Sequence, residues 1–398
     1  MADGFIVRRG GKAEEVLRTT NPSINFVSKG FFDIVVTFTN NDAAEADVFY
    51  GLTSPLTDKV TLATATTSSN ITFSGLDGGT QYIISAYAIV TDTTLKKIKS
   101  EIVSTSITTD TPVYTAATGG TTEEYNLDGK RYRSHTFLED GNFVVTTVGD
   151  AIDDRNKVDY LIIAGGASGG RGNTGSGGGG GAGGFRTTIA PVPSDESPDA
   201  KVVVTATTYG VLVGAGGTGL SNTGPGTNGI DSSVFNIIST GGGAGGSGAV
   251  DGVIGGSGGG GGGFTSGSTG DTGISGQGRN GGDGFGVGSN NNAGGGGGGA
   301  GSVGGNATSN TSPGVGGNGL ANNLRTGSNE TRAGGGGGAG GTGATGGSGG
   351  GGNGVSGTGT AGSGTVNTGS GGGGNARNGT SGSGGSGIVI IRYEIAPN

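Results

Sequence analysis

The chain has 398 residues and a net charge of −8, with 102 glycines, one histidine, no cysteine and no tryptophan. The missing cysteines exclude disulfides and thiolate metal sites. The acidic balance, without a cluster of Lys or Arg, argues against a nucleic-acid-binding protein. The length predicts two or three domains, and the composition changes sharply near Gly165, because 89 of the 102 glycines occur from that residue onward.

Residues 1–23 are predicted to form an extended attachment arm, with a frayed tail as the open alternative. Three apolar residues that could add to a partner's sheet precede two arginines. The candidates for attachment are Phe5, Ile6, Val7, Arg8 and Arg9. The apolar run is too short for a signal-peptide core or a membrane span, so no membrane insertion is expected.

Residues 24–110 are predicted to form a β-sandwich, because stretches of β-forming residues recur with turn residues between them at short spacing. The expected strands are 33–39, 47–53, 59–66, 70–76, 81–90 and 101–108. The segment 75-GLDGGTQYIISAYAIV-90 resembles the Leu-x-Pro-Gly-Thr-x-Tyr-x-x-x-Val-x-Ala signature of fibronectin type III domains. The resemblance implies a tyrosine corner, in which the Tyr82 hydroxyl bonds to the backbone upstream. Two departures are Gly78 in place of the usual proline and the lack of any tryptophan for the buried position in strand B.

Residues 111–164 are predicted to be a small β segment that leads into the glycine-rich part. Turns are expected at Asp128-Gly129 and at 140–142, and the apolar run 158-VDYLIIAGG-166 is expected to be an edge strand that enters the glycine-rich part directly.

Residues 165–398 cannot build an ordinary core, because glycine has no side chain to bury and loses the most backbone entropy on ordering. In a polyproline-II-like helix all backbone N–H and C=O groups point outward, so glycine helices can pack side by side and bond to one another as a polyglycine-II sandwich. Uninterrupted runs such as 177–181 and 258–263 are expected in its interior. Collagen is disfavoured because the Gly-X-Y period is missing, and disorder is the remaining alternative. The pattern 387-GIVIIRYEI-395 predicts a closing strand.

Segments rich in Asn, Ser and Thr interrupt the glycine runs and are expected to be loops at the helix ends, where length variation costs little. The longest are 264–294 and 302–334. Variable loops on a rigid scaffold form a recognition surface.

Six segments carry a family resemblance: 132-YRSHTFLEDGNFVV-145, 158-VDYLIIAGGASGG-170, 177-GGGGGAGGFRTT-188, 211-VLVGAGGTG-219, 228-NGIDSSVFNIISTGGGAGG-246 and 384-GGSGIVIIRY-393. They resemble the glycine-rich tail-fibre and adhesin proteins of tailed bacteriophages. The resemblance implies a protein at the virion surface, assembled in the host cytoplasm, trimeric as a fibre and monomeric as a tip adhesin. Its expected partners are other virion proteins, through the arm, and a protein or glycan receptor on a bacterial surface.

In that family distal loops contact the receptor, often through aromatic residues. The loops here are poor in aromatic residues, which keeps a non-receptor structural appendage or decoration fibre of the virion open. The candidates for receptor binding are Phe264, Arg279, Phe285, Leu324, Arg325 and Arg332.

Enzymatic chemistry is not expected, and no cofactor or metal is predicted. The junction 160-YLIIAGGASGG-170 mimics a dinucleotide-binding turn, but the glycines that follow cannot form the required helix. His135 is the sole histidine and fits an alternating strand better than a catalytic triad. Asp150, Asp153 and Asp154 lack the spacing of a calcium loop and are expected to form a solvated turn.

Overall fold

The structure, a computed structural model, describes residues 5–9, 12–16, 23–29, 33–39, 45–51, 58–62, 68–91, 97–99, 102–193, 196–288 and 291–397. It is nearly all β, as predicted, and over these residues its helical structure is the short 3-10 turn η1 (Ile152–Asp154). In this described part no helix is long and apolar enough to cross a membrane. The chain divides into two compact units, Met1–Val113 and Tyr114–Asn398.

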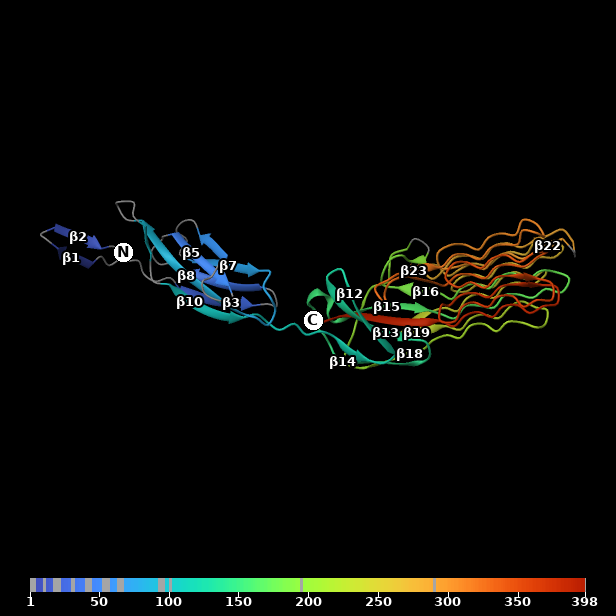
Figure 1. The fold of residues 1–398 in the computed structure, drawn as a ribbon, viewed down its shortest axis with the longest axis horizontal. Coiled ribbons are helices and arrows are strands. Elements are labelled where there is room, and N and C mark those ends of the chain that lie inside the picture. The colour runs from blue at the N-terminus through green and yellow to red at the C-terminus, as the bar shows by residue number, and fades with distance from the viewer. Residues whose placement is uncertain are drawn as a thin grey trace. The chain divides into compact units, whose positions relative to one another are not determined.

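The described strands of the first unit form three sheets (Figure 1). One pairs β1 (Phe5–Arg9) with β2 (Lys12–Val16). A second has the order β3 (Ser23–Lys29), β4 (Asp33–Thr39), β7 (Ser68–Ser74). The third has the order β10 (Val103–Thr108), β8 (Gln81–Thr91), β5 (Glu45–Gly51), β6 (Asp58–Leu62), and β9 (Lys97–Lys99) also pairs with β8.

A shared core joins the second and third of these sheets. Alternating residues of β4 and β7 pack with alternating residues of β8, as a two-layered sheet structure requires; the buried set is Ile34, Val36, Ile71, Phe73, Leu76, Tyr82, Ile84 and Ala86. The Tyr82 hydroxyl accepts a hydrogen bond of 2.7 Å from the backbone N–H of Asp77. This is the upstream backbone contact expected for Tyr82.

The predicted attachment candidates Phe5 to Arg9 coincide with β1, whose backbone pairs antiparallel with β2 of the same chain. Residues 1–4, 10–11 and 17–22 of the predicted arm lie outside the described residues. Attachment to a partner stays a prediction.

The second unit is organised around a large antiparallel sheet. Its order is β12 (Thr121–Leu127), β13 (Lys130–Phe137), β27 (Ile388–Ile395), β15 (Lys157–Ile163), β16 (Phe185–Thr187), with β17 (Val202–Val203) also paired to β15. A three-stranded sheet has the order β11 (Ala116–Thr118), β14 (Gly141–Thr147), β18 (Thr208–Val211). The paired short strands are β19 (Ser232–Val234) with β20 (Ile237–Ser239), β21 (Phe285–Gly286) with β22 (Asn292–Ala293), β23 (Leu320–Asn322) with β24 (Glu330–Arg332), and β25 (Val355–Ser356) with β26 (Asn375–Ala376).

The C-terminal strand β27 is predicted correctly, and it lies in the middle of the large sheet, between β13 and β15. The expectation that the run ending at residue 166 is an edge is wrong: β15 has β27 on one side and β16 and β17 on the other. Its apolar run is continuous because both faces are buried. Tyr160 and Ile162 pack into one core, and Leu161 and Ile163 pack into another on the opposite face.

The glycine-rich segments bond in the pattern of a helix with three residues per turn. The N–H groups of Ala164, Ala167 and Gly170 donate at 2.9–3.1 Å to the carbonyls of Gly184, Gly181 and Gly178. Those of residues 165, 168 and 171 donate to residues 230, 227 and 224, and those of residues 166 and 169 to residues 385 and 382. Every third residue reaches the same neighbouring segment, so the extended backbone is a polyglycine-II helix in a packed lattice.

Segment 177–184 lies at the centre of this lattice. It donates backbone hydrogen bonds to segments 240–246, 295–298 and 369–375. It accepts backbone hydrogen bonds from segments 164–170, 257–260 and 336–339. Three donor and three acceptor neighbours surround one helix, so most of its backbone groups are satisfied without water.

Side chains are excluded from the centre by the close approach of the backbones. A Cβ added to Gly178, Gly179, Gly180 or Gly181 would come within 3.0 Å of a backbone oxygen of a neighbouring segment, a separation that real Cβ atoms essentially never show. The uninterrupted run is therefore a packing requirement.

At the flanks of the lattice, Asn and Asp side chains take the place of a missing neighbour. The side-chain oxygens of Asn228 and Asp231 accept hydrogen bonds of 2.9 and 2.8 Å from the backbone N–H groups of Ala244 and Gly241. A second pair repeats the arrangement: Asn280 and Asp283 accept from Gly273 and Gly270. In each pair both the acceptors and the donors are three residues apart, as the three-residue turn requires.

Candidate functional site

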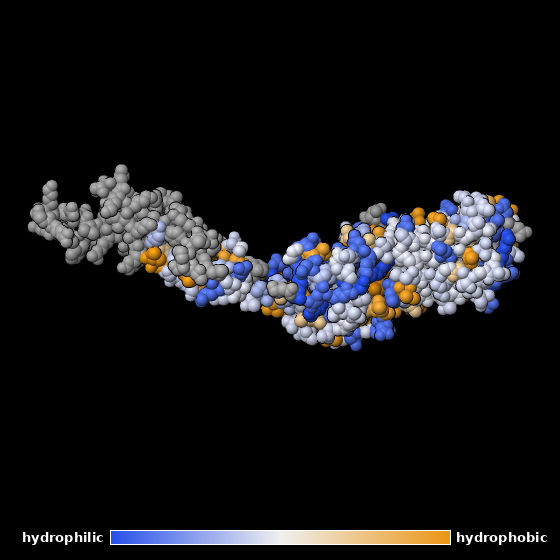
Figure 2. Space-filling model, viewed as in Figure 1, coloured by the Kyte–Doolittle hydropathy of each residue, from blue (hydrophilic) through white to orange (hydrophobic). Residues whose placement is uncertain are grey.

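The lattice has two different ends. Figure 1 shows β22 at one end, called the distal end here, and the large sheet with β12, β13 and β15 at the other, called the sheet end. Turns that join lattice segments meet at the distal end through short bridges, among them Arg171 with Gly224 and Ser176 with Gly263. Figure 2 shows mostly weakly polar residues along the lattice and strongly hydrophilic residues gathered over the large sheet.

The distal turns are fastened to one another by side-chain hydrogen bonds. Arg171 is 8% exposed and donates from Nε to the carbonyl of Gly379, at 2.5 Å, and from Nη1 to Oγ1 of Thr223, at 3.1 Å. Ser176 Oγ donates to Oδ1 of Asn292 at 2.6 Å. These bonds cross between turns that are far apart in sequence, so the distal surface is preorganised.

Phe264 and Phe285 lie at this end, in neighbouring turns, and both are half-buried. A Cβ on Gly286 would meet the carbonyl oxygen of Phe264, which shows how closely the two turns approach. Val287, which sequence reasoning did not select, follows Phe285 and is 63% exposed. The distal surface therefore combines two partly covered rings with an exposed valine.

The other predicted contact residues lie at the sheet end. Arg279 is half-buried beside the turn that precedes it, where the N–H of Gln277 bonds to the carbonyl of Ile274. Leu324, Arg325 and Arg332 belong to the β23–β24 hairpin and its connection. The expectation that these three are exposed loop residues is wrong for Leu324, which is 0% exposed, and for Arg332, which is 7% exposed.

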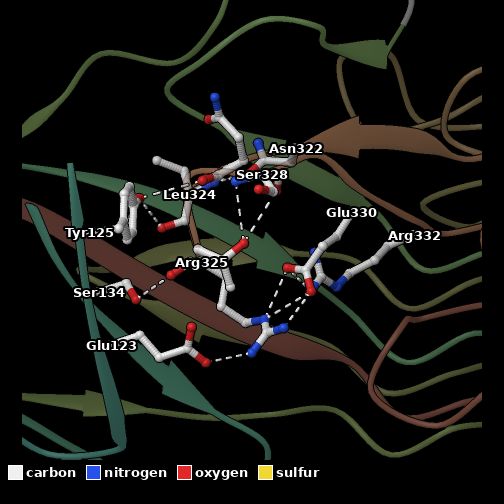
Figure 3. A network of polar contacts seen from close by, with 11 residues as sticks. Glu123, Tyr125, Ser134, Asn322, Leu324, Arg325, Ser328, Glu330 and Arg332 are labelled. Carbon is white, nitrogen blue, oxygen red and sulfur yellow. Dashed lines mark hydrogen bonds and ion pairs between the residues drawn. The ribbon is translucent and has the colours of Figure 1, made fainter. Parts of the chain in front are cut away.

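The β23–β24 connection is bound to the large sheet through its backbone carbonyls (Figure 3). Tyr125 of β12 donates from its hydroxyl to the carbonyl of Leu324 at 2.6 Å, and Ser134 of β13 donates to the carbonyl of Arg325 at 2.6 Å. The Leu324 side chain packs with Leu161 and Ile163 in the core. Because Leu324 is buried and the two carbonyls are hydrogen-bonded, this turn fastens the hairpin to the large sheet.

Arg325 is the centre of an ion-pair network in which two arginines face two glutamates (Figure 3). Its Nη1 lies 2.6 Å from Oε1 of Glu123, and its Nε lies 2.9 Å from Oε2 of Glu330. Arg332 Nη2 lies 2.8 Å from the same Oε2. Burial raises the pKa of Glu330, but the hydrogen bonds from Arg325 and Arg332 outweigh it and hold that pKa below its usual value. The charges of the network balance.

The residues that suggest catalysis have structural roles. His135 is buried, and its ring nitrogens lie 2.6 Å from the Gly119 carbonyl and 3.0 Å from the Tyr393 hydroxyl. Burial lowers the pKa of His135. Asp150 and Asp153 pair with Arg155 at 3.0 and 3.1 Å, so the acidic turn is ion-paired.

Two features that the sequence raised are the acidic residues and the glycines after β15, and both lie in the part of the chain that the structure describes. No group of three or more His, Asp or Glu residues there could hold a metal ion. The glycines after β15 continue into a polyglycine-II helix, and no α-helix N-terminus follows them.

Comparison with known protein families gives a match for the glycine-rich part of the chain. Residues 139–394 match the family model described as a glycine-rich domain. The match includes β15, the whole lattice and all of β27 except its last residue. No curated protein matches the sequence.

Proposed function

The chain belongs to the glycine-rich domain family, and we propose that it is a bacteriophage virion protein, a tail fibre or fibre-tip adhesin whose distal turns recognise a receptor on the host surface. The observation that carries the proposal is the contrast between lattice and turns. A Cβ has no room at Gly178 to Gly181, whereas turn residues such as Val287 are exposed. The central glycines leave no room for a side chain, whereas exposed turn residues can change without disturbing the lattice, which is what a recognition scaffold requires.

The other parts of the chain fit this role. Residues 1–23 would attach to other virion proteins, and the first unit, with the Tyr82 contact, would be a fibronectin type III-like spacer. The receptor would be a protein or a glycan of the bacterial surface. A homotrimer is the expected assembly of a fibre, and a monomer that of a tip adhesin. The virion surface is the proposed location.

A structural appendage or decoration fibre without receptor affinity is the second candidate. The observation that favours it is the small aromatic area at the distal end, since Phe264 and Phe285 are both half-buried. Aromatic anchors usually dominate recognition surfaces. This candidate has the same fold and no affinity for cells.

Saturable binding of the purified full chain to intact candidate host cells tests the proposal, with a thermal melt followed by circular dichroism alongside. Val287→Asp should reduce cell binding by about tenfold or more, because a charge replaces an apolar contact. The matched control is Val303→Asp, because Val303 is 59% exposed in the lattice and outside the distal turns. Equal loss in both variants, or no loss in either, would contradict the role of the distal turns. A cooperative melt without any cell binding would favour the appendage.

A further inference from the structure

A cavity of about 280 Å³ lies between the β12–β13 strands and the β23–β24 hairpin. Glu123, Thr136 and Leu138 line it from the large sheet. Arg332 and Asn367 line it from the lattice. The volume suits one molecule of the size of a monosaccharide.

Two polar groups in the cavity wall lack a partner. Arg332 Nη1 and Thr136 Oγ1 are buried and have no hydrogen-bond partner among the described residues. Arg332 is 7% exposed and Thr136 is 9% exposed, so both groups are largely removed from bulk water. A buried polar group without a partner is costly and marks a functional or ligand-binding position. A ligand carboxylate in the cavity could accept a hydrogen bond from the guanidinium through one oxygen and from the hydroxyl through the other.

The remaining wall supplies the other contacts that a sugar needs. Asn367 Oδ1 accepts a hydrogen bond of 3.0 Å from Ser386 Oγ, which fixes the amide and leaves its N–H groups as donors. Glu123 Oε1 is bound by Arg325, and its carboxylate can accept bonds from sugar hydroxyls. Leu138, which is 48% exposed, offers an apolar surface for the face of a ring.

We propose that this cavity binds one carboxylated pyranose, a uronic-acid unit of a surface polysaccharide, with its carboxylate at Arg332 and Thr136 and its hydroxyls at Glu123 and Asn367. A carboxylate can accept from the unpartnered Nη1 of Arg332, and it adds a single negative charge to a network in which Arg325 and Arg332 are already balanced by Glu123 and Glu330. A dianion such as phosphate is disfavoured, since it would place two uncompensated charges beside two carboxylates. The proposal rests on the proposed function as the source of the polysaccharide, but free sugars test it without cells, so the two can fail separately.

The test is a calorimetric titration of the full chain with glucuronic acid, glucose and inorganic phosphate. Glucuronic acid should bind with a dissociation constant in roughly the millimolar range, as expected for a ligand of this size. Glucose and phosphate should bind at least about tenfold more weakly, because one lacks the carboxylate and the other carries excess charge. Absence of saturable binding of glucuronic acid, or equal binding of glucose, would overturn the proposal.

Thr136→Val is the decisive variant because it keeps the side-chain shape and removes the unpartnered hydroxyl. Glucuronic acid should bind about tenfold more weakly, while the melting temperature without sugar should not fall, since no hydrogen bond is lost. Arg332→Gln should remove the preference for glucuronic acid over glucose. Thr122→Val is the matched control: Thr122 is exposed on the same strand pair and does not line the cavity, so sugar binding should stay unchanged. Wild-type affinity in Thr136→Val would refute the assignment.

Discussion

Gly180→Ala is the sharpest perturbation of the lattice, because Gly180 lies in the central segment. Its N–H donates to the carbonyl of Gly372 at 2.8 Å, and its carbonyl accepts from Gly336 at 2.9 Å. An added Cβ would lie 2.7 Å from the Ser168 carbonyl oxygen and closer still to that of Ala167. Ordinary contact begins at 3.4 Å, so the helices must separate by at least the difference of 0.7 Å.

That separation, from segment 164–170, would stretch the hydrogen bond that the Ala167 N–H donates to the Gly181 carbonyl from 2.9 Å to beyond the 3.5 Å limit of a hydrogen bond, which leaves one donor and one acceptor unpaired. Each buried group left without a partner costs about 1–3 kcal/mol, so the loss should be about 2–6 kcal/mol. Alanine also lowers the conformational entropy of the unfolded chain, but this offsets only about 0.4–1 kcal/mol of the loss. Differential scanning calorimetry of the full chain should therefore show a lower melting temperature for the glycine-rich unit.

Gly224→Ala is the matched control for this experiment. A Cβ on Gly224 would have nothing within 4 Å, and its φ is not in the left-handed region. The variant should be as stable as the wild type or more stable, by up to about 1 kcal/mol. If Gly180→Ala melts like Gly224→Ala, the close-packed lattice is wrong.

Three further changes test other parts of the structure. Asp159→Asn should cost about 3–5 kcal/mol in unfolding free energy by calorimetry, because Arg392 Nη2 lies 2.7 Å from Asp159 and both side chains are buried; an unchanged transition would contradict the buried ion pair. Tyr82→Phe removes the hydrogen bond from Asp77 and should lower only the transition of the first unit, by about 1 kcal/mol; a shift in the other transition would refute this. The pKa of Glu330 is held below its ordinary 4.5, so its stabilisation is present above that pH and is lost as the pH falls through the lowered value. In Glu330→Gln the urea concentration at the unfolding midpoint should therefore fall less steeply with pH below about pH 4.5 than in the wild type. The same pH dependence in both proteins would show that Glu330 does not contribute to acid destabilisation.

The sequence carries the local features of the fold. The stretch 33–39 coincides with β4, and β27 spans the predicted closing segment, because β-forming residues between turn signals mark strands reliably. The unbroken glycine run 177–181 identifies the centre of the lattice, since no other residue fits there. Strands such as β3 and β9 were not predicted.

The order of the strands and the place of each turn are set by tertiary packing. Nothing local to β27 indicates that it lies between β13 and β15. Lattice segments run back and forth, so successive turns alternate between the two ends. Counting turns from β15 would have placed residues 320–332 at the sheet end, where Leu324 is buried. The three-residue spacing of Asn228 and Asp231 is a further sequence signal. It indicates that these side chains lie on the flank of the lattice and accept hydrogen bonds from a neighbouring backbone segment.

Amide hydrogen exchange across the central segment 177–184 of the full chain tests the account most directly. Its N–H groups bond to three neighbouring segments, so they should exchange only through global unfolding of the glycine-rich unit and be among the slowest in the protein. Exchange at the rate of an unstructured chain would mean that the glycine-rich part is not a lattice, and the rigid display of its turns would fall with it.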